Sequence, residues 1–362
     1  MGDTLRMTAS VNVPAGARTS ARPRPKDLSI ESLRGLACLL IVAYHAIPIA
    51  DAVEGLINYG YLGHCFRLIR LPLFTAISGY VYAMHALAPG EFGRFIGGKS
   101  RRILLPWVSV TLLTLGLRSV LQKSGLGVDE VLRSLWLPID HLWFLPAIFW
   151  VFLATAVLES TGCLRSLRAW LLTCAVSWLG ATFLLGTFLF AGLPGFFQLL
   201  PFFLFGLGLF RFRAELSTPL AIRVYAVTAV VGLAVHQMMW FGLAHLSSTE
   251  YNLLVLFTVY GTQGLLFRYR RHVPALAALG RWSFAIYLFH PMAISIAARL
   301  AAGLHLTNIH ALFALKIALG LALPVALALV VRRIPWLNLV LLGERSPRRA
   351  GAVSRDAAAT RT

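Results

Sequence analysis

The chain has 362 residues, of which 58% are hydrophobic and only 13% are charged. This composition is too apolar for a water-soluble protein and indicates a membrane protein. A formal net charge of +19 also fits nucleic-acid binding, so the positions of the charges have to decide between the two. The four cysteines have no metal-ligand spacing and two fall in predicted membrane spans, so we expect neither a disulfide framework nor a metal site.

The apolar stretches divide the chain into one membrane domain between two polar tails. Residues 1–26 are basic and contain prolines but no apolar stretch, which predicts a disordered cytoplasmic tail and excludes a secretory signal peptide. Residues 332–362 predict a second basic, disordered cytoplasmic tail. Between them, over residues 27–331, we predict an all-α integral membrane domain of ten transmembrane helices. The predicted spans are residues 33–50, 71–88, 103–121, 141–158, 169–190, 194–210, 222–246, 250–267, 282–302 and 310–331.

The lysines and arginines indicate how this domain is oriented. Of the 33 basic residues, 26 fall in the tails and in the loops on the same side, and 5 fall in the opposite loops. Loops rich in Lys and Arg stay in the cytoplasm, so both termini are predicted to be cytoplasmic. The charge therefore reports orientation in a lipid bilayer, and nucleic-acid binding is not expected.

The first span combines an arginine at its start with a histidine inside its apolar run. Arg34 and His45 are eleven residues apart, so on a helix they share a face and lie ~16 Å apart along the axis. Ionisable groups are costly in lipid and usually face a polar interior. The pattern fits a functional site, and it also fits a buried histidine bonded to a neighbouring helix.

A basic cluster precedes the third span on the predicted cytoplasmic side. Lys99 and Arg102, with Arg101 between them, lie on one face of a helix and suit phosphate binding through charge-assisted hydrogen bonds. A positive-inside anchor explains the cluster equally well. In the second span, Ser78 and the glycine after it permit close approach of a helix or of a ligand chain, and helix packing is the simpler explanation.

Two further groups lie at the fourth and ninth spans. Asp140, His141 and Trp143 fit either an aromatic belt or a cavity mouth where an indole stacks on a sugar and polar groups bond its hydroxyls. Tyr287 and His290 are three residues apart on one helix face. A structural or substrate-positioning role suits His290 better than that of a catalytic base.

Several motifs are absent from the sequence. It contains no HExxH, Walker A, GxSxG or HxxxxD motif, so zinc protease, ATPase and serine hydrolase activities lose support. Carboxylates are almost absent from the spans, which weighs against a proton- or sodium-coupled transporter.

In order along residues 27–331, these groups resemble the acyltransferase-3 family of bacterial integral-membrane acyltransferases. The family's first-helix pattern is similar to Glu31, Arg34-Gly35 and His45, with Glu where the family commonly has Asp. Its Phe-x-x-x-Ser-Gly pattern resembles residues 74–79, and its Arg-x-x-Arg resembles residues 99–102, with Lys99 in first place. Residues 141–145 and 283–291 also match, especially in the sugar O-acetyltransferase branch that includes fucose 4-O-acetylase-like proteins.

The resemblance implies transfer of an acyl group, usually acetyl from cytoplasmic acetyl-CoA, to a sugar hydroxyl in a polysaccharide, oligosaccharide or glycolipid. It also implies a bacterial inner-membrane location. The residues it implicates in catalysis are His45, as the base, with Arg34 and Glu31. Those it implicates in donor binding are Lys99, Arg101, Arg102 and Ser78. Those it implicates in acceptor binding are Asp140, His141, Trp143, Tyr287 and His290.

Two alternatives stay open from the sequence. Within the enzyme class, the acceptor is a small glycosylated metabolite or macrolide in place of a polymer. In a different class, the chain is a polytopic glycan transporter or flippase whose path is lined by Arg34, His45 and His290. No metal is expected in either case.

Overall fold

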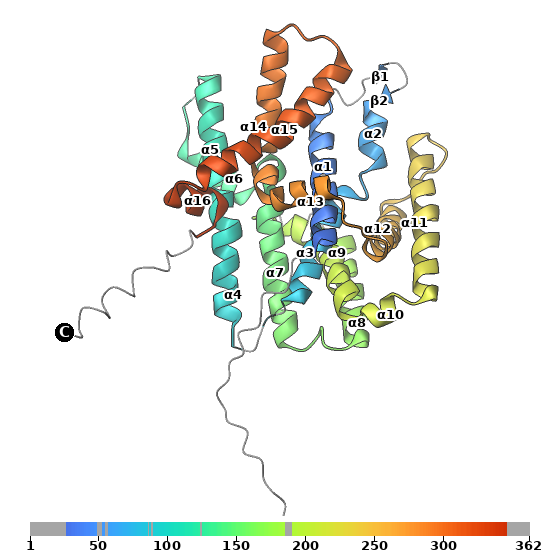
Figure 1. Cartoon of the computed structure of the whole chain (residues 1–362). Helices are drawn as coiled ribbons and strands as arrows, with labels where there is room; N and C mark the ends of the chain where they lie inside the picture. The colour runs from blue at the N-terminus through green and yellow to red at the C-terminus, as the bar shows by residue number, and fades with distance from the viewer. Residues whose placement is uncertain are drawn as a thin grey trace, which may run out of the picture.

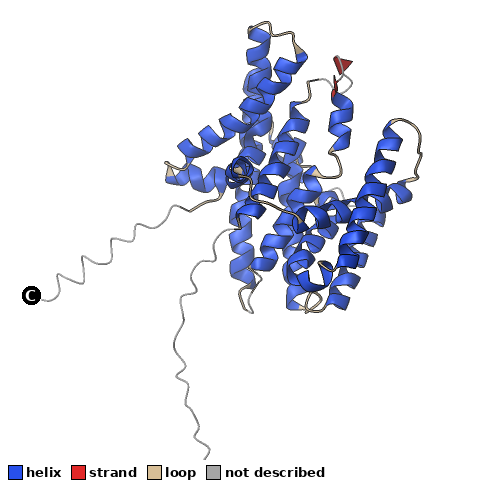
Figure 2. Ribbon diagram, turned by 45° about the vertical axis from the view of Figure 1, so that its right-hand side comes forward, coloured by secondary structure: helices blue, strands red, loops and turns tan. Residues whose placement is uncertain are grey.

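The computed structural model describes residues 27–48, 53–54, 57–85, 87, 90–123, 125–184 and 190–345. The described chain is a bundle of helices with one short antiparallel strand pair at its edge (Figures 1 and 2). Residues 1–26 and 346–362, which hold the predicted N-terminal tail and most of the C-terminal one, lie outside the described residues.

The elements follow one another in the chain with short connections. They are α1 (Leu28–Ala46), β1 (Val53–Glu54), β2 (Ile57–Asn58), α2 (Tyr59–Cys65), α3 (Arg70–Met84), α4 (Phe92–Lys99), η1 (Ser100–Leu104), α5 (Leu105–Gln122), α6 (Val128–Trp136), η2 (Asp140–Trp143), α7 (Phe144–Ser160), α8 (Leu167–Phe183), α9 (Leu193–Arg211), α10 (Arg213–Leu216), α11 (Pro219–Trp240), α12 (Ser248–Arg268), α13 (Pro274–Arg281), α14 (Ser283–Gly303), α15 (Ile309–Val331) and α16 (Pro335–Leu342).

Among the described residues, seven helices are long and apolar enough to cross a membrane. They are α1, the continuous α4–η1–α5, η2 with α7, α9, α11, α14 and α15. The other three predicted spans coincide with α3, which has 15 residues, with α8, which has 17, and with the less apolar α12. The all-α membrane class is thus confirmed, while the count of ten spans and the cytoplasmic termini stay predictions.

Helix α1 begins and ends earlier than the span predicted from the sequence. Asp27 caps its first turn by accepting a hydrogen bond from the Ser29 amide at 3.0 Å. Pro48 disfavours a helical conformation at Ile47, which has φ −52° and ψ 122°, so the helix stops at Ala46. His45 therefore lies in the last turn of α1, not in the middle of its apolar run.

Helices α3 and α9 approach each other so closely that only glycine fits at the crossing. A Cβ atom added to Gly79 would overlap the carbonyl group of Phe203, and one added to Gly206 would overlap that of Ala76. Such reciprocal contacts between small residues and backbone are typical of membrane helix pairs. This packing accounts for the glycine of the Ser-Gly pair in the second predicted span.

The same arrangement joins α1 to α13. Gly35 faces the carbonyl group of Leu276, and Gly280 faces that of Glu31. Because α13 leads directly into α14, this crossing fixes α1 relative to α14. In Figure 1 the β1–β2 pair, the α11–α12 turn and the α14–α15 turn lie at the upper end of the bundle, and α10 and the start of α4 lie at the lower end. The C-terminal end of α1 leads toward the upper end.

Candidate active site

Three histidines from distant parts of the chain meet at the end of α1. The ring centroid of His290, on α14, lies 5.0 Å from that of His45 on α1 and 5.0 Å from that of His141 on η2. The rings of His45 and His141 are 6.5 Å apart. The structure therefore brings together three residues that the sequence singled out separately.

Main-chain carbonyl groups fix the orientation of two of these rings. Nδ1 of His290 lies 3.0 Å from the carbonyl oxygen of Ile286 and 2.9 Å from that of Tyr287. Nε2 of His141 lies 3.2 Å from the carbonyl oxygen of Leu288. Each of these nitrogens must carry a proton to donate, so the other nitrogen of each neutral ring is an acceptor. Those acceptors, Nε2 of His290 and Nδ1 of His141, are buried and have no partner among the described residues.

His45 is the most exposed of the three, and its side chain faces a cavity that His141 also lines. No hydrogen bond from its ring to another described residue is present. The cavity has a volume of about 220 Å³. Its lining residues are Ile41, Tyr44, His45, Arg70, Leu71, Asp140, His141, Trp143, Phe144 and Tyr287. Five of the predicted site residues thus share one cavity, and His290 lies behind them with none of its surface exposed.

Asp140 and Tyr287 hold the wall of this cavity in place. Asp140 forms an ion pair with Arg118 of α5 and has a φ of +45°, a left-handed conformation that Asp tolerates better than most residues. The hydroxyl of Tyr287 donates to the main-chain carbonyl of His141. Both contacts fasten η2, the short helix that carries His141 and Trp143, to its neighbours.

Arg70 and Tyr44 also line the cavity, and neither was predicted from the sequence as a site residue. The Arg70 guanidinium carbon lies 3.4 Å from the centre of the Tyr44 ring, a cation–π contact, and Arg70 donates to the carbonyl oxygen of Gly63 at 3.3 Å. One signal was available in the sequence, because Arg70 is among the five basic residues that the positive-inside rule does not explain.

Glu31 and Arg34 lie at the other end of α1 and pair with each other. One guanidinium nitrogen of Arg34 donates to both carboxylate oxygens of Glu31, at 2.9 and 3.0 Å. Eleven residues of helix separate Arg34 from His45, which is ~16 Å. The structure does not bring this ion pair to the histidine cavity.

The four predicted donor-binding residues have different surroundings. The Lys99 ammonium lies 3.5 Å from the centre of the Phe152 ring. Arg101 and Arg102 belong to η1, a π-helical turn of the kind often found at functional sites. Arg102 is exposed and makes no hydrogen bond or ion pair within the described residues, whereas Nε of Arg101 is buried without a partner there. The Ser78 hydroxyl donates to a carbonyl one turn back in α3, at 3.1 Å.

In the described ranges, no group of three or more His, Cys, Asp or Glu side chains has the arrangement of a metal site. The histidine cluster therefore offers proton acceptors and hydrogen bonds. It places a free imidazole in a cavity beside two imidazoles of fixed orientation.

Comparison with known proteins gives one match. The model of the acyltransferase-3 family, described as an acyltransferase domain, matches residues 27–333. This range contains every described element except α16. No curated protein and no solved structure gives a significant match.

Proposed function

Because the chain belongs to this acyltransferase family, we propose that it moves an acetyl group from acetyl-CoA to a hydroxyl of a sugar. The acceptor is part of a polysaccharide, such as an exopolysaccharide, or of an oligosaccharide or glycolipid, and the protein works in a bacterial inner membrane. The convergence of His45, His141 and His290 at a cavity carries the proposal. Acyl transfer to a hydroxyl needs a base for the hydroxyl proton and groups that hold the acceptor in place.

His45 is the proposed base. Its ring is exposed to the cavity and has no competing bond there, so it can accept the proton of a bound hydroxyl. As the hydroxyl oxygen bonds to the thioester carbonyl carbon, the carbon–sulfur bond breaks, and the proton passes from His45 to the departing CoA sulfur. The products are an acetate ester and CoA with a free thiol, and His45 is neutral again.

His141 and His290 are proposed as positioning residues. Each has a buried, unprotonated and unpartnered nitrogen, which can accept a hydrogen bond from the His45 ring. Their other nitrogens are bonded to main chain, so neither ring can turn without losing a buried hydrogen bond. Rings held in this way suit orientation better than proton shuttling.

Arg102 is the best disposed of the proposed donor-binding residues. Its guanidinium is exposed and unpaired among the described residues, as a phosphate-binding arginine should be before its ligand arrives. Lys99 and Arg101 add positive charge beside it. Arg34 is already neutralised by Glu31, so we assign that pair to the structure of the α1 end near the donor.

The test compares the native chain with His45→Ala at matched membrane levels. Mass spectrometry of surface glycans and extracted glycosides measures ester-linked acetyl groups, and a thiol assay measures CoA released by isolated membranes. Removing a general base should lower transfer by about 10²- to 10⁴-fold. His272→Ala, a change of an exposed loop histidine outside the cluster, is the matched control and should leave transfer unchanged.

Two outcomes would count against the proposal. Transfer retained by His45→Ala would exclude His45 as the base. A native protein that releases no CoA with any glycan offered, yet moves glycans across vesicle membranes, would be a transporter.

A further inference from the structure

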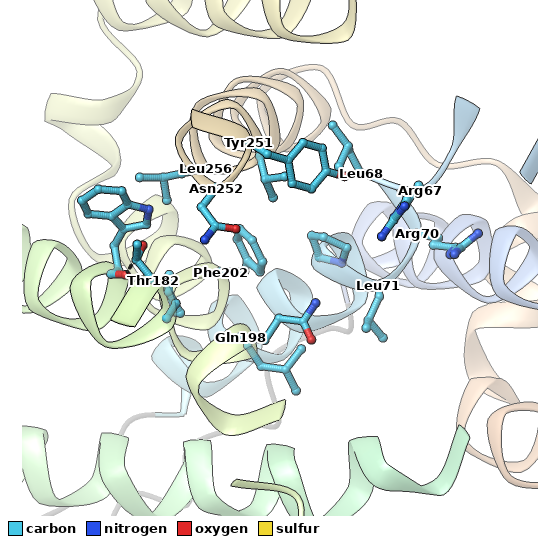
Figure 3. A pocket seen from close by; sticks show the side chains of 16 residues that line it. Arg67, Leu68, Arg70, Leu71, Thr182, Gln198, Phe202, Tyr251, Asn252 and Leu256 are labelled. Carbon is cyan, nitrogen blue, oxygen red and sulfur yellow. Dashed lines mark hydrogen bonds between the residues drawn. The ribbon is translucent and has the colours of Figure 1, made fainter. Parts of the chain in front are cut away.

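A second cavity adjoins the histidine cavity and shares Arg70 and Leu71 with it. It has a volume of about 340 Å³ and lies among α3, α8, α9 and α12 (Figure 3). We call it the side chamber. Binding cavities for small organic ligands start at about 300 Å³, so the chamber has room for a sugar-sized group.

The side chamber combines apolar walls with free amide groups. Figure 3 shows Gln198 of α9 and Asn252 of α12 projecting into the space, with Phe202 and Tyr251 beside them. Neither amide side chain is hydrogen-bonded to another described residue. Apolar and aromatic walls with a few free amides suit a ligand with hydroxyl groups, because the rings cover its faces and the amides bond its edges.

Arg67 and Arg70 both line the chamber, and Arg67 is the one of the two without a partner among the described residues. Its side chain is exposed and makes no hydrogen bond or ion pair with a described residue. It also borders a third cavity, of about 430 Å³, which includes His64 and Trp240. No carboxylate lines the side chamber or this third cavity. An unpaired guanidinium at the meeting point of two cavities has the geometry to bind a carboxylate or phosphate from either side.

The position of Arg67 within the fold strengthens this point. By the predicted topology, only 5 of the 33 basic residues lie on the side opposite the basic tails, where the positive-inside rule does not favour them. Arg118 is paired with Asp140, and Arg70 is stacked on Tyr44. Arg67 has no such partner within the described chain, and unlike Lys123 and Arg133 it lines these two cavities.

We propose that the side chamber binds the sugar acceptor and that this acceptor is acidic, with a carboxylate or phosphate group held by Arg67. Gln198 and Asn252 bond its hydroxyl groups, and one hydroxyl reaches past Arg70 to His45. The proposal rests on the proposed acyl transfer, because only a transferase has an acceptor. Binding of an acidic sugar to the side chamber can be measured without any transfer. Arg67 is then a specificity-determining residue for acidic sugars.

The experiment measures binding to the full chain in phosphatidylcholine nanodiscs. The probes are methyl β-D-glucuronide and methyl β-D-glucoside, which share the ring and differ in the carboxylate. Isothermal titration calorimetry should show tighter binding of the glucuronide by about 10- to 100-fold, as for a charge-assisted hydrogen bond. Arg67→Gln should abolish this preference, and Arg67→Lys should keep part of it. Arg133→Gln, a change of an exposed arginine on α6, is the control and should keep all of it.

Three results would overturn the proposal. The first is equal binding of both probes by the native chain, and the second is an unchanged preference in Arg67→Gln. The third is loss of glucuronide binding when the nanodiscs contain phosphatidylglycerol, which would make the chamber a site for lipid headgroups. An Arg67-dependent preference in a protein that transfers no acyl group would support the chamber and refute only the proposed function.

Discussion

The close crossing of α1 and α13 predicts that adding a single methyl group at Gly35 lowers both stability and activity. A Cβ atom added at Gly35 would lie 2.7 Å from the carbonyl carbon of Leu276 and 3.1 Å from the amide nitrogen of Gly280, and nearer still to the carbonyl oxygen. Carbon atoms pack at about 3.5 to 4.0 Å, so Gly35→Ala must push the two helices apart by roughly 1 Å. The atoms that would have to move are backbone on both sides, which leaves no cheap relaxation.

Both stability and activity should respond to this separation. Overpacking of this kind costs about 1 to 3 kcal/mol of unfolding free energy. Helix α1 carries His45 and α13 leads into the helix of His290, so the crossing also sets the 5.0 Å spacing of their rings. Misplacing catalytic groups by about 1 Å lowers transfer by about 10²-fold. We therefore expect Gly35→Ala to lose activity even in the fraction that stays folded.

Two measurements test this prediction. Titration with dodecyl sulfate in mixed micelles gives the unfolding free energy, and acetyl transfer from acetyl-CoA is measured separately without denaturant. Gly116→Ala in α5 is the matched control, because a Cβ atom added there meets nothing within 4 Å. It should stabilise the protein by about 0.5 to 1 kcal/mol, since alanine is the better helix former. The reasoning is refuted if both substitutions shift the unfolding free energy in the same direction.

Three further predictions follow from the site and from the start of α1. Arg102→Ala should raise the acetyl-CoA concentration needed for half-maximal transfer about 10- to 100-fold, and an unchanged dependence on acetyl-CoA would contradict its role in phosphate binding. Lys99→Ala, which uncovers the Phe152 ring, should mainly lower stability. His290→Asn keeps a donor near the Nδ1 position and loses the Nε2 acceptor, so the variant should fold normally and transfer the acyl group about 10- to 100-fold more slowly. A native transfer rate would exclude a positioning role for His290. Burial raises the pKa of Asp27, but hydrogen bonds from Ser29 and the nearby Arg270 guanidinium outweigh burial and lower the pKa overall. The cap therefore stabilises α1 above about pH 4, and its contribution is lost as the pH falls below that value. Asp27→Ala should cost about 1 kcal/mol of unfolding free energy at pH 7 and much less at pH 3, and an equal cost at both would refute this.

Much of the fold was predictable because long apolar stretches in a sequence identify its membrane helices. The all-α membrane class and the acyltransferase family are confirmed. The end of α1 was misjudged although Pro48 stands in the sequence, because the apolar run continues past the residue where the proline stops the helix. The weaker apolar character of α12 and the shortness of α3 and α8 are why length and composition alone give fewer spans than predicted.

The candidate site was predictable only residue by residue. His45, His141 and His290 were each visible as a polar group beside an apolar run, but their meeting depends on how α1, η2 and α14 pack. The pairing of Arg34 with Glu31 could have been anticipated from their i,i+3 spacing. Arg70 and Arg67 carry no local motif, and only the unequal distribution of charge between the two sides points to them.

The main-chain bonds of the histidine cluster have a consequence for how this site can vary among related sequences. The groups that decide which imidazole nitrogens carry a proton are carbonyls of residues 286–288, which every amino acid possesses. Substitutions at Ile286 or Leu288 can therefore drift without reversing the polarity of the cluster, provided that the helix keeps its path. A comparison of sequences would therefore identify the histidines but not the main-chain carbonyl groups that orient them. In such a site the helical backbone itself, and not a side chain, determines how the imidazole rings are oriented.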